Sequence, residues 1–322
     1  MRFAWVLSIF FWVSGAVAEL TAEQQTAKDK GLYFYQLIRH HEAKPWLEIS
    51  SDAGDAESQY YLAEIIRQDK MMMTESAIKL YSLAAKQGSI DAMIRLADLK
   101  NDLCIIAGGC PVGELSPDGW AQEVRKLAGA RAQRGDSEAM RQLFSLTGKL
   151  SYLFQAAEAG NGEAQYKISG LYREGLGSFV IPGNREKEIE RWLARAAASG
   201  YPHAMNSYAN LMLRRNDRKS AGDWIERAAR AGHIGAMSSY IAYTAHMPNN
   251  VDYPLDYVKA YGLALLFSEA RSNKSSPNYG AKMLEKIAAK MNAQQISDAH
   301  HFSEKWREEY PSLSEFRPKY GH

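Results

Sequence analysis

Apolar and small residues recur along this chain at fixed distances from six glycines. Four residues after each glycine stands Ala, or Ser58 in one case, and eight residues after it stands Leu, Ile or Tyr. Upstream, an Ala pair precedes four of the glycines, and an aromatic residue stands eight positions before four of them. The six glycines are Gly54, Gly88, Gly135, Gly160, Gly200 and Gly232. Self-similarity of this kind indicates a repeat architecture.

Each glycine is expected to separate two helices. Glycine readily adopts the left-handed conformation that a helix C-terminus often needs, and Asp, Ser or Asn follows several of these glycines as an N-cap. The Ala at position four lets a neighbouring helix pack closely, and the apolar residue at position eight lies one turn further on the same face. The pattern predicts an all-α fold, an α-solenoid of antiparallel helix pairs in which each pair covers the apolar face of the next.

The most complete copy runs from Gly160 to Gly200. It contains Gly160-x-x-x-Ala164, then Tyr172-x-x-Gly175-x-Gly177, and then Trp192 followed by Ala196-Ala197 and Gly200. This order resembles the Sel1-like repeat, a relative of the tetratricopeptide repeat. The resemblance implies a repeat solenoid over residues 45–270, after an N-terminal helical segment at 19–44. It also implies C-terminal capping helices and a tail at 271–322.

Two insertions interrupt the repeats, at 100–118 and 246–256. Insertions in such arrays form loops along one side, where specific recognition often occurs.

The N-terminus has the pattern of a secretory signal peptide. Arg2 precedes an apolar run from Phe3 to Val13, and Ala16-Val17-Ala18 forms a cleavage site. We expect residues 1–18 to be removed and the mature chain to reside in the periplasm without membrane insertion. The alternative is an uncleaved N-terminal anchor, although the run is shorter than a membrane span requires.

The only two cysteines, Cys104 and Cys110, lie in the first insertion with Gly108 and Gly109 between them. In an oxidising compartment this pair is expected to form a disulfide. Two free thiols are the alternative, and two cysteines are too few for a structural zinc site.

Charge and motifs exclude several classes of function. Lys and Arg total 39 against 37 Asp and Glu, well mixed along the chain, which argues against a nucleic-acid partner. No nucleotide-binding, hydrolase or zinc-protease motif occurs, so we expect no cofactor and no catalysis. Two runs of adjacent residues could suggest a metal site, His40-His41-Glu42 and Met71-Met72-Met73. Side chains of adjacent residues point in different directions on a helix, so we expect surface or packing roles for them rather than metal binding.

A binding protein is the function that these features favour. Export, Sel1-like repeats and a length near 300 residues resemble the periplasmic immunity proteins paired with type VI secretion phospholipase effectors. That resemblance implies a protein partner, a toxin encoded nearby, which the chain would bind and neutralise. The alternatives are a cell-envelope adaptor for a secretion or polysaccharide export assembly, and an enzyme with an unrecognised site.

Aromatic and Arg side chains often anchor tight protein interfaces. The alternatives here are core packing for the tyrosines and helix-dipole compensation for the Arg pair. The candidate partner-binding residues are Tyr172, Arg173, Arg214, Arg215 and Tyr243, with Tyr208 and Tyr240 as further tyrosines of the same kind.

Overall fold

The computed structural model describes residues 19–179, 181–271 and 279–316. Within these ranges the chain forms sixteen α-helices and two short 3-10 helices, and no strand. The predicted signal peptide at 1–18 lies outside the described residues. The α-helices are α1 (Ala22–Gln36), α2 (His40–Asp52), α3 (Ala56–Lys70), α4 (Glu75–Lys86), α5 (Ile90–Ala97), α6 (Pro117–Ala132), α7 (Ser137–Thr147), α8 (Leu150–Glu158), α9 (Gly162–Arg173), α10 (Asn184–Ala198), α11 (Pro202–Arg214), α12 (Arg218–Arg230), α13 (Ile234–Thr244), α14 (Tyr257–Ala270), α15 (Tyr279–Ala288) and α16 (Ala293–Glu309).

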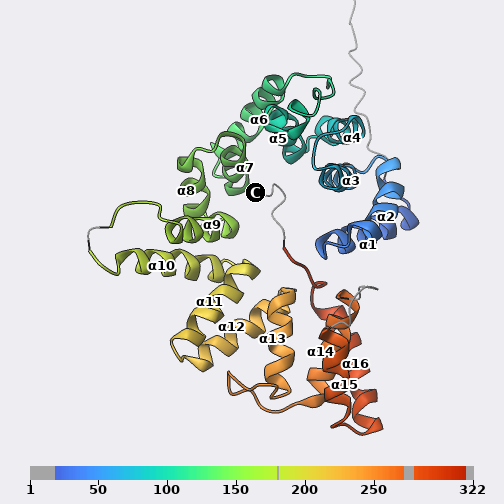
Figure 1. The fold of residues 1–322 in the computed structure, drawn as a ribbon, viewed down its shortest axis with the longest axis vertical. Coiled ribbons are helices and arrows are strands. Elements are labelled where there is room, and N and C mark those ends of the chain that lie inside the picture. The colour runs from blue at the N-terminus through green and yellow to red at the C-terminus, as the bar shows by residue number, and fades with distance from the viewer. Residues whose placement is uncertain (1–18, 180, 272–278, 317–322) are drawn as a thin grey trace, which may run out of the picture.

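Successive helices pack against one another as pairs, and the pairs follow a curved path (Figure 1). The odd-numbered helices from α3 to α13 lie on the inner side of the curve, and the even-numbered helices from α4 to α12 lie outside (Figure 1). Inner helices also contact each other directly, as α5 does α7 and α9 does α11. The predicted all-α solenoid of antiparallel helix pairs is confirmed.

The six repeat glycines end the outer helices α2, α4, α6, α8, α10 and α12. Their φ angles lie between 84° and 94°, the left-handed region in which a side chain would be strained. An inner helix begins two residues after each of them. Asp55, Ser89, Asp136 and Asn161 follow four of the glycines, and each side chain accepts a hydrogen bond from the first turn of the next helix.

Small residues let the helices of neighbouring repeats pack closely. The residue four positions after each glycine is at most 1% exposed, and so are the Ala pairs before Gly88, Gly160, Gly200 and Gly232. Trp192 is also 1% exposed and packs against Phe154 with a ring distance of 6.1 Å. The small Ala residues let neighbouring helices approach closely, and large side chains one turn away fill the remaining space. Together they form the buried face of each helix pair.

A buried ion pair ties three helices together near the start of the array. Glu64 of α3 is 1% exposed, and its Oε1 accepts hydrogen bonds from Arg95 Nε of α5 at 2.5 Å and from Tyr81 Oη of α4 at 2.7 Å. Arg95 Nη2 donates to Glu64 Oε2 at 3.0 Å, which makes the pair bidentate. Burial acts to lower the pKa of the Arg95 guanidinium, but the charge of Glu64 raises it overall.

The boundary between an N-terminal segment and the repeats, predicted at residue 45, falls inside α2. Because α1 and α2 pack closely together, the stack of helix pairs already begins at Ala22. The physical reason lies in α1, where Gly31 allows a close approach: a Cβ there would lie 2.7 Å from the Leu47 side chain of α2. At the other end, α15 and α16 pack on α14 beyond the last repeat glycine.

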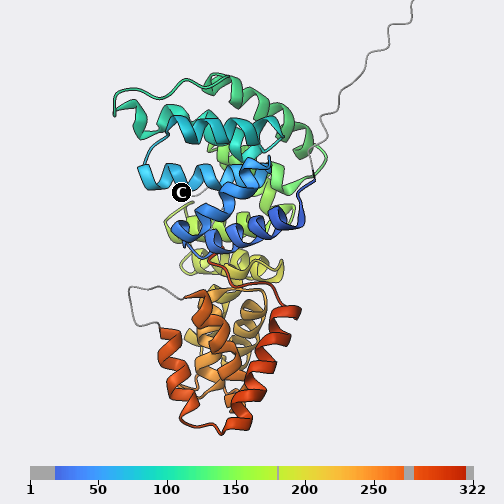
Figure 2. The same ribbon diagram turned by 90° about the vertical axis from the view of Figure 1, so that its right-hand side faces the viewer.

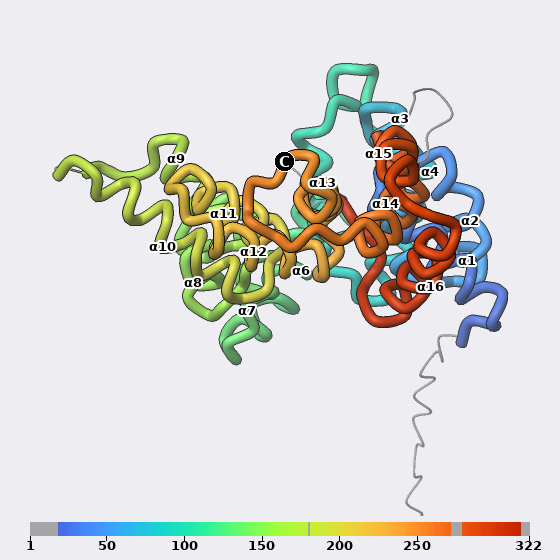
Figure 3. Tube along the Cα trace, turned by 90° about the horizontal axis from the view of Figure 1, so that it is seen from below, coloured from blue at the N-terminus to red at the C-terminus, as the bar shows by residue number. Residues whose placement is uncertain are grey.

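The first helix pair meets the C-terminal helices, so the curve closes into a ring. Arg39 Nη1 at the start of α2 donates to the carbonyl oxygen of Glu269 in α14 at 3.2 Å, and Glu315 N donates to Gln36 O at 3.0 Å. The side view shows α1 and α2 directly above the C-terminal helices (Figure 2). From below, α1, α2, α14 and α16 lie together at one end (Figure 3).

Candidate functional site

The inner helices present one side chain from a shared repeat position near their N-terminal ends. This residue lies three positions after each repeat glycine, and its chemistry changes along the array. The first four inner helices have a carboxylate there, α11 has a histidine, and α13 has a glycine. The residues are Glu57, Asp91, Glu138, Glu163, His203 and Gly235.

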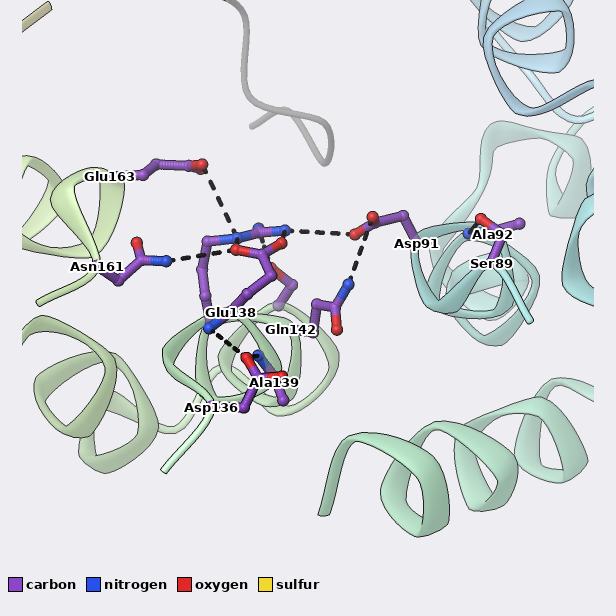
Figure 4. A network of polar contacts seen from close by, with 11 residues as sticks. Ser89, Asp91, Ala92, Asp136, Glu138, Ala139, Gln142, Asn161 and Glu163 are labelled. Carbon is purple, nitrogen blue, oxygen red and sulfur yellow. Dashed lines mark hydrogen bonds and ion pairs between the residues drawn. The ribbon is translucent and has the colours of Figure 1, made fainter. Parts of the chain in front are cut away.

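Three of these carboxylates, Asp91, Glu138 and Glu163, belong to one network (Figure 4), which is joined by Arg141 of α7. Its Nη2 lies 2.7 Å from Glu138 Oε1 and 3.3 Å from Asp91 Oδ1, and its Nε lies 3.8 Å from Glu163 Oε2. The Arg141 side chain is 5% exposed, whereas those of Glu138 and Glu163 are 42% and 30% exposed. The network therefore fixes α5, α7 and α9 relative to one another while two carboxylates remain accessible.

Two amide side chains complete the network. Gln142 Nε2 donates to Asp91 Oδ2 at 3.4 Å, and Asn161 Nδ2 donates to Glu138 Oε2 at 3.3 Å. Burial raises the pKa of the Glu163 carboxyl above its usual range, because the charge of Arg141 offsets only part of the lost hydration.

A groove of about 610 Å³ opens beside this network. We call it the inner groove, and it runs along α9, between the C-terminal half of α7 and the start of α11. Aromatic side chains form part of its wall, and charged residues of both signs line the rest. The lining includes Arg141, Phe144, Glu163, Tyr166, Lys167, Arg173, Glu174, Tyr201 and His203.

The chain's own C-terminal segment, Pro311–Phe316, which we call the tail, docks next to the inner groove. It leaves α16 and runs toward the middle of the ring (Figure 1). Ser314 N donates to Gly232 O at 2.8 Å, and Ile234 N donates to Ser314 O at 3.2 Å, so the tail pairs with the α12–α13 turn as an isolated parallel bridge. The inner side of the array therefore accepts an extended polypeptide segment through backbone hydrogen bonds.

Two histidines connect the tail to the inner helices. The Ala236 backbone N–H donates to His233 Nδ1 at 3.0 Å, so the proton of neutral His233 is on Nε2. That N–H donates to His203 Nδ1 at 3.0 Å, and His203 Nε2–H then donates to Phe316 O at 3.1 Å. The Phe316 ring also stacks on His233 at 6.3 Å. This relay requires both imidazoles to be neutral.

Replacing Gly232 with alanine is expected to loosen the tail. A Cβ at Gly232 would lie 2.7 Å from Ser312 O, whereas nothing lies within 4 Å of a Cβ at Gly200. Because both glycines have positive φ, both alanine variants carry a similar backbone strain of roughly 1–2 kcal/mol, and only Gly232→Ala adds the clash. Amide hydrogen exchange in 311–316 should be at least about tenfold faster in Gly232→Ala than in Gly200→Ala. Equal exchange in the two variants would contradict the docking described here.

A second hollow, of about 420 Å³, lies where the first helix pair meets the C-terminal helices. Its wall includes Trp46, Trp306 and Tyr310, together with Pro311 and Leu313 of the tail. Lys30 Nζ covers the Trp46 ring at 4.4 Å, and Arg307 forms an ion pair with Glu269 at 2.7 Å. These contacts belong to ring closure, so we place the candidate binding surface at the inner groove.

The candidate residues chosen from the sequence do not converge on one site. Arg173 lines the inner groove. Tyr172 packs its ring against Phe179, with 5.7 Å between centroids. Arg215 makes a bidentate ion pair with Glu190 at 2.5 and 2.6 Å.

The other candidates are also dispersed. Arg214 is exposed at the end of α11, and half-buried Tyr243 accepts a hydrogen bond from Asn250 Nδ2 at 3.5 Å. Tyr240 is 1% exposed and Tyr208 is half-buried, as expected for core packing.

The first insertion forms a loop with exposed aliphatic side chains. Its cysteines, Cys104 and Cys110, are joined by a disulfide in the structure. Ile106 is 83% exposed and Val112 is 97% exposed. Asp102 anchors the base of the loop, since its Oδ1 accepts hydrogen bonds from Met73 N at 2.8 Å and Cys104 N at 3.0 Å.

The described part of the chain contains no group of three or more His, Cys, Asp or Glu side chains placed to hold a metal ion. Met73 is buried while Met71 is 73% exposed, so the three methionines diverge. No helix within the described ranges has the length and apolar character needed to cross a membrane.

Sequence reasoning missed His203, His233 and the tail. His233 occupies the N-cap position that Asp55, Ser89, Asp136 and Asn161 fill in other repeats. A histidine at a position where Asp, Ser and Asn are usual was the available signal.

Comparisons with known proteins give matches among solved structures. No protein-family model matches the chain, and no curated protein matches it. A protective antigen of uropathogenic Escherichia coli with an SLR fold is 23% identical, with a TM-score of 0.46 over 90% of this chain; the match spans 62% of that longer chain. A Sel1 repeat protein from Oxalobacter formigenes is 20% identical, with a TM-score of 0.38 over 80% of this chain and 100% of its own. Both of these structural neighbours are Sel1-repeat proteins.

Proposed function

We propose that this chain is a non-enzymatic binding protein that holds a segment of a partner protein in its inner groove. The observation that carries the proposal is the docked tail, an extended segment already bound by the inner helices through backbone hydrogen bonds and His203. Repeat arrays commonly use their concave surfaces in this way. A rigid stack of helices also limits the conformational entropy lost on binding.

We further propose that the mature chain acts in the periplasm as an immunity protein and neutralises a type VI secretion phospholipase toxin encoded beside it. The signal-peptide pattern at 1–18 supports export, and the Sel1-like repeat pattern supports a binding role. Neutralisation of a toxin requires a tight complex, which the groove, with its aromatic and Arg side chains, is suited to form.

The test is co-expression of the full chain, with its leader, and the phospholipase encoded by the adjacent gene, directed to the periplasm. We expect the two proteins to co-purify in a one-to-one complex and the cells to survive. As a control, a chain without residues 1–18 should stay in the cytoplasm and give no protection. Cell death despite periplasmic chain would overturn the immunity role, and absence of a complex would overturn the binding of this partner.

A further inference from the structure

The tail lies on a site, which we call the tail site, with separate places for its backbone and for its side chains. Its backbone pairs with the α12–α13 turn, where Gly232 O accepts from Ser314 N and Ile234 N donates to Ser314 O. Leu313 is 6% exposed and packs in the same apolar cluster as Trp306 and Ile234. An extended segment whose backbone pairs with a folded surface, with pockets for some of its side chains, is a common mode of peptide recognition.

The Phe316 ring occupies a slot formed by two imidazoles. It stacks on the His233 ring with 4° between the planes, and it meets the His203 ring edge to face with 6.2 Å between centroids. Ser314 Oγ accepts a hydrogen bond from Phe316 N at 2.9 Å, and this turn fixes the ring relative to the paired backbone. The tail site therefore recognises an apolar residue, a serine and an aromatic residue at the spacing of residues 313, 314 and 316.

Gly232 keeps the place of the bound backbone open. A Cβ at Gly232 would lie 2.7 Å from Ser312 O and 3.5 Å from Pro311 O. At the other five repeat glycines nothing lies within 4 Å of the same point. The missing side chain at Gly232 therefore serves the bound segment as well as the end of α12.

We propose that an extended segment of the partner protein, with an apolar residue, a serine and an aromatic residue at this spacing, binds at the tail site and displaces the tail. This inference rests on the proposed binding function and adds where the partner segment pairs and which side chains it carries. The tail is then an intramolecular competitor that occupies the tail site until the partner binds.

The tail competes at a high local concentration because it is joined to α16. A tethered segment has an effective concentration on the order of 1 mM, so a free segment with the same contacts displaces it poorly. The partner segment therefore needs contacts beyond the tail site. His203 donates to Phe316 O and also lines the inner groove, where the Tyr166 and Tyr201 rings lie 6.1 and 5.7 Å from its own. A partner segment that continues into the inner groove gains these contacts, and the tail excludes segments that do not.

The experiment supplies the tail sequence as a separate molecule. The probe is a fluorescein-labelled, C-terminally amidated peptide with the sequence of residues 311–316, and fluorescence anisotropy measures its affinity for the full-length protein. Phe316→Ala weakens the chain's own tail and leaves the tail site intact. We expect the peptide to bind Phe316→Ala at least about tenfold more tightly than the wild type, because more molecules have an empty site. A peptide with alanine in place of its phenylalanine should bind Phe316→Ala at least about tenfold more weakly.

Matched variants locate the bound peptide. Phe316→Ala/Gly232→Ala should lose the binding, whereas Phe316→Ala/Gly200→Ala should retain it, since a Cβ at Gly200 meets nothing within 4 Å. Both glycines have positive φ, so backbone strain is common to the two variants. Phe179→Ala removes another half-buried phenylalanine ring, outside the tail site, and should bind the peptide as weakly as the wild type does.

Equal affinity of the peptide for the wild type and for Phe316→Ala would overturn the proposal, and so would binding that survives Gly232→Ala. The toxin of the proposed function separates the two levels of inference. A toxin complex that is equally tight with the wild type and with Phe316→Ala overturns displacement of the tail and leaves the proposed function standing. Absence of a toxin complex, with the peptide results as expected, overturns the proposed partner and supports the segment inferred for the tail site.

Discussion

Replacing Glu64 with alanine is expected to lower the free energy of unfolding by about 3–5 kcal/mol, because it leaves the buried Arg95 charge without its partner. Arg95 is 6% exposed, and Glu64 accepts two of its hydrogen bonds as well as that of Tyr81. Urea denaturation followed by circular dichroism at 222 nm measures the loss.

A surface pair gives the matched control for Glu64. Glu188 and Arg191 of α10 form an ion pair at 2.6 Å, but their side chains are 31% and 51% exposed. Glu188→Ala should therefore change the stability by less than about 1 kcal/mol. Replacing both buried partners, as Glu64→Met/Arg95→Met, should cost less than Glu64→Ala alone, since no charge is stranded. Equal losses of stability from Glu64→Ala and Glu188→Ala would show that the buried Glu64–Arg95 pair contributes no more to stability than a surface pair.

Lowering the pH from 7 to 4 is expected to release the tail from the inner helices. Burial and the neighbouring His203 lower the pKa of His233 to about 4, from its usual 6.5. A histidine with a depressed pKa stabilises the docked state fully above pH 6.5, and that contribution is lost as the pH falls from 6.5 toward 4. The full shift corresponds to up to about 3 kcal/mol. Protection factors of the amides in 311–316, corrected for the intrinsic effect of pH on exchange, report this loss.

The variant that tests the role of His233 is His233→Asn. Asparagine can still accept the hydrogen bond from Ala236 N–H as an N-cap, but it does not titrate. Protection of the tail in this variant should depend much less on pH between 6.5 and 4 than in the wild type. A decline of the same size in both proteins would assign the pH effect to other groups.

The fold was largely predictable because its signals are local. Glycine at a left-handed helix end and Ala at a close contact depend on a few neighbouring residues. The glycine recurs six times and the Ala five times, with Ser58 in its place once. Residue 45, where the sequence pattern places the start of the repeats, lies inside α2, because α1 and α2 lack the full repeat pattern although they pair in the same way. Their close contact depends on Gly31, which nothing in the repeat pattern marks.

The candidate site was much less predictable, because it depends on contacts between distant segments. Ser314 and Gly232 lie 82 positions apart in the printed sequence, and no periodic pattern joins them. Arg215 was a reasonable choice from composition, but its donors are taken up by Glu190 on the previous helix pair. Glu138 and Glu163 belong to the repeat pattern itself, where acidic residues near a helix start usually stabilise the helix. Only the structure shows that Arg141 brings them together.

Contact between the two ends of the array affects how it comes apart. Linear stacks fray from their terminal units, since each of those has a neighbour on one side only. Here the unit formed by α1 and α2 touches α3 along the chain and Glu269 and Glu315 across the ring. Neither terminal unit can unfold without breaking its contact with the opposite terminal unit. Unfolding of the first helices should therefore be coupled to unfolding of the last ones.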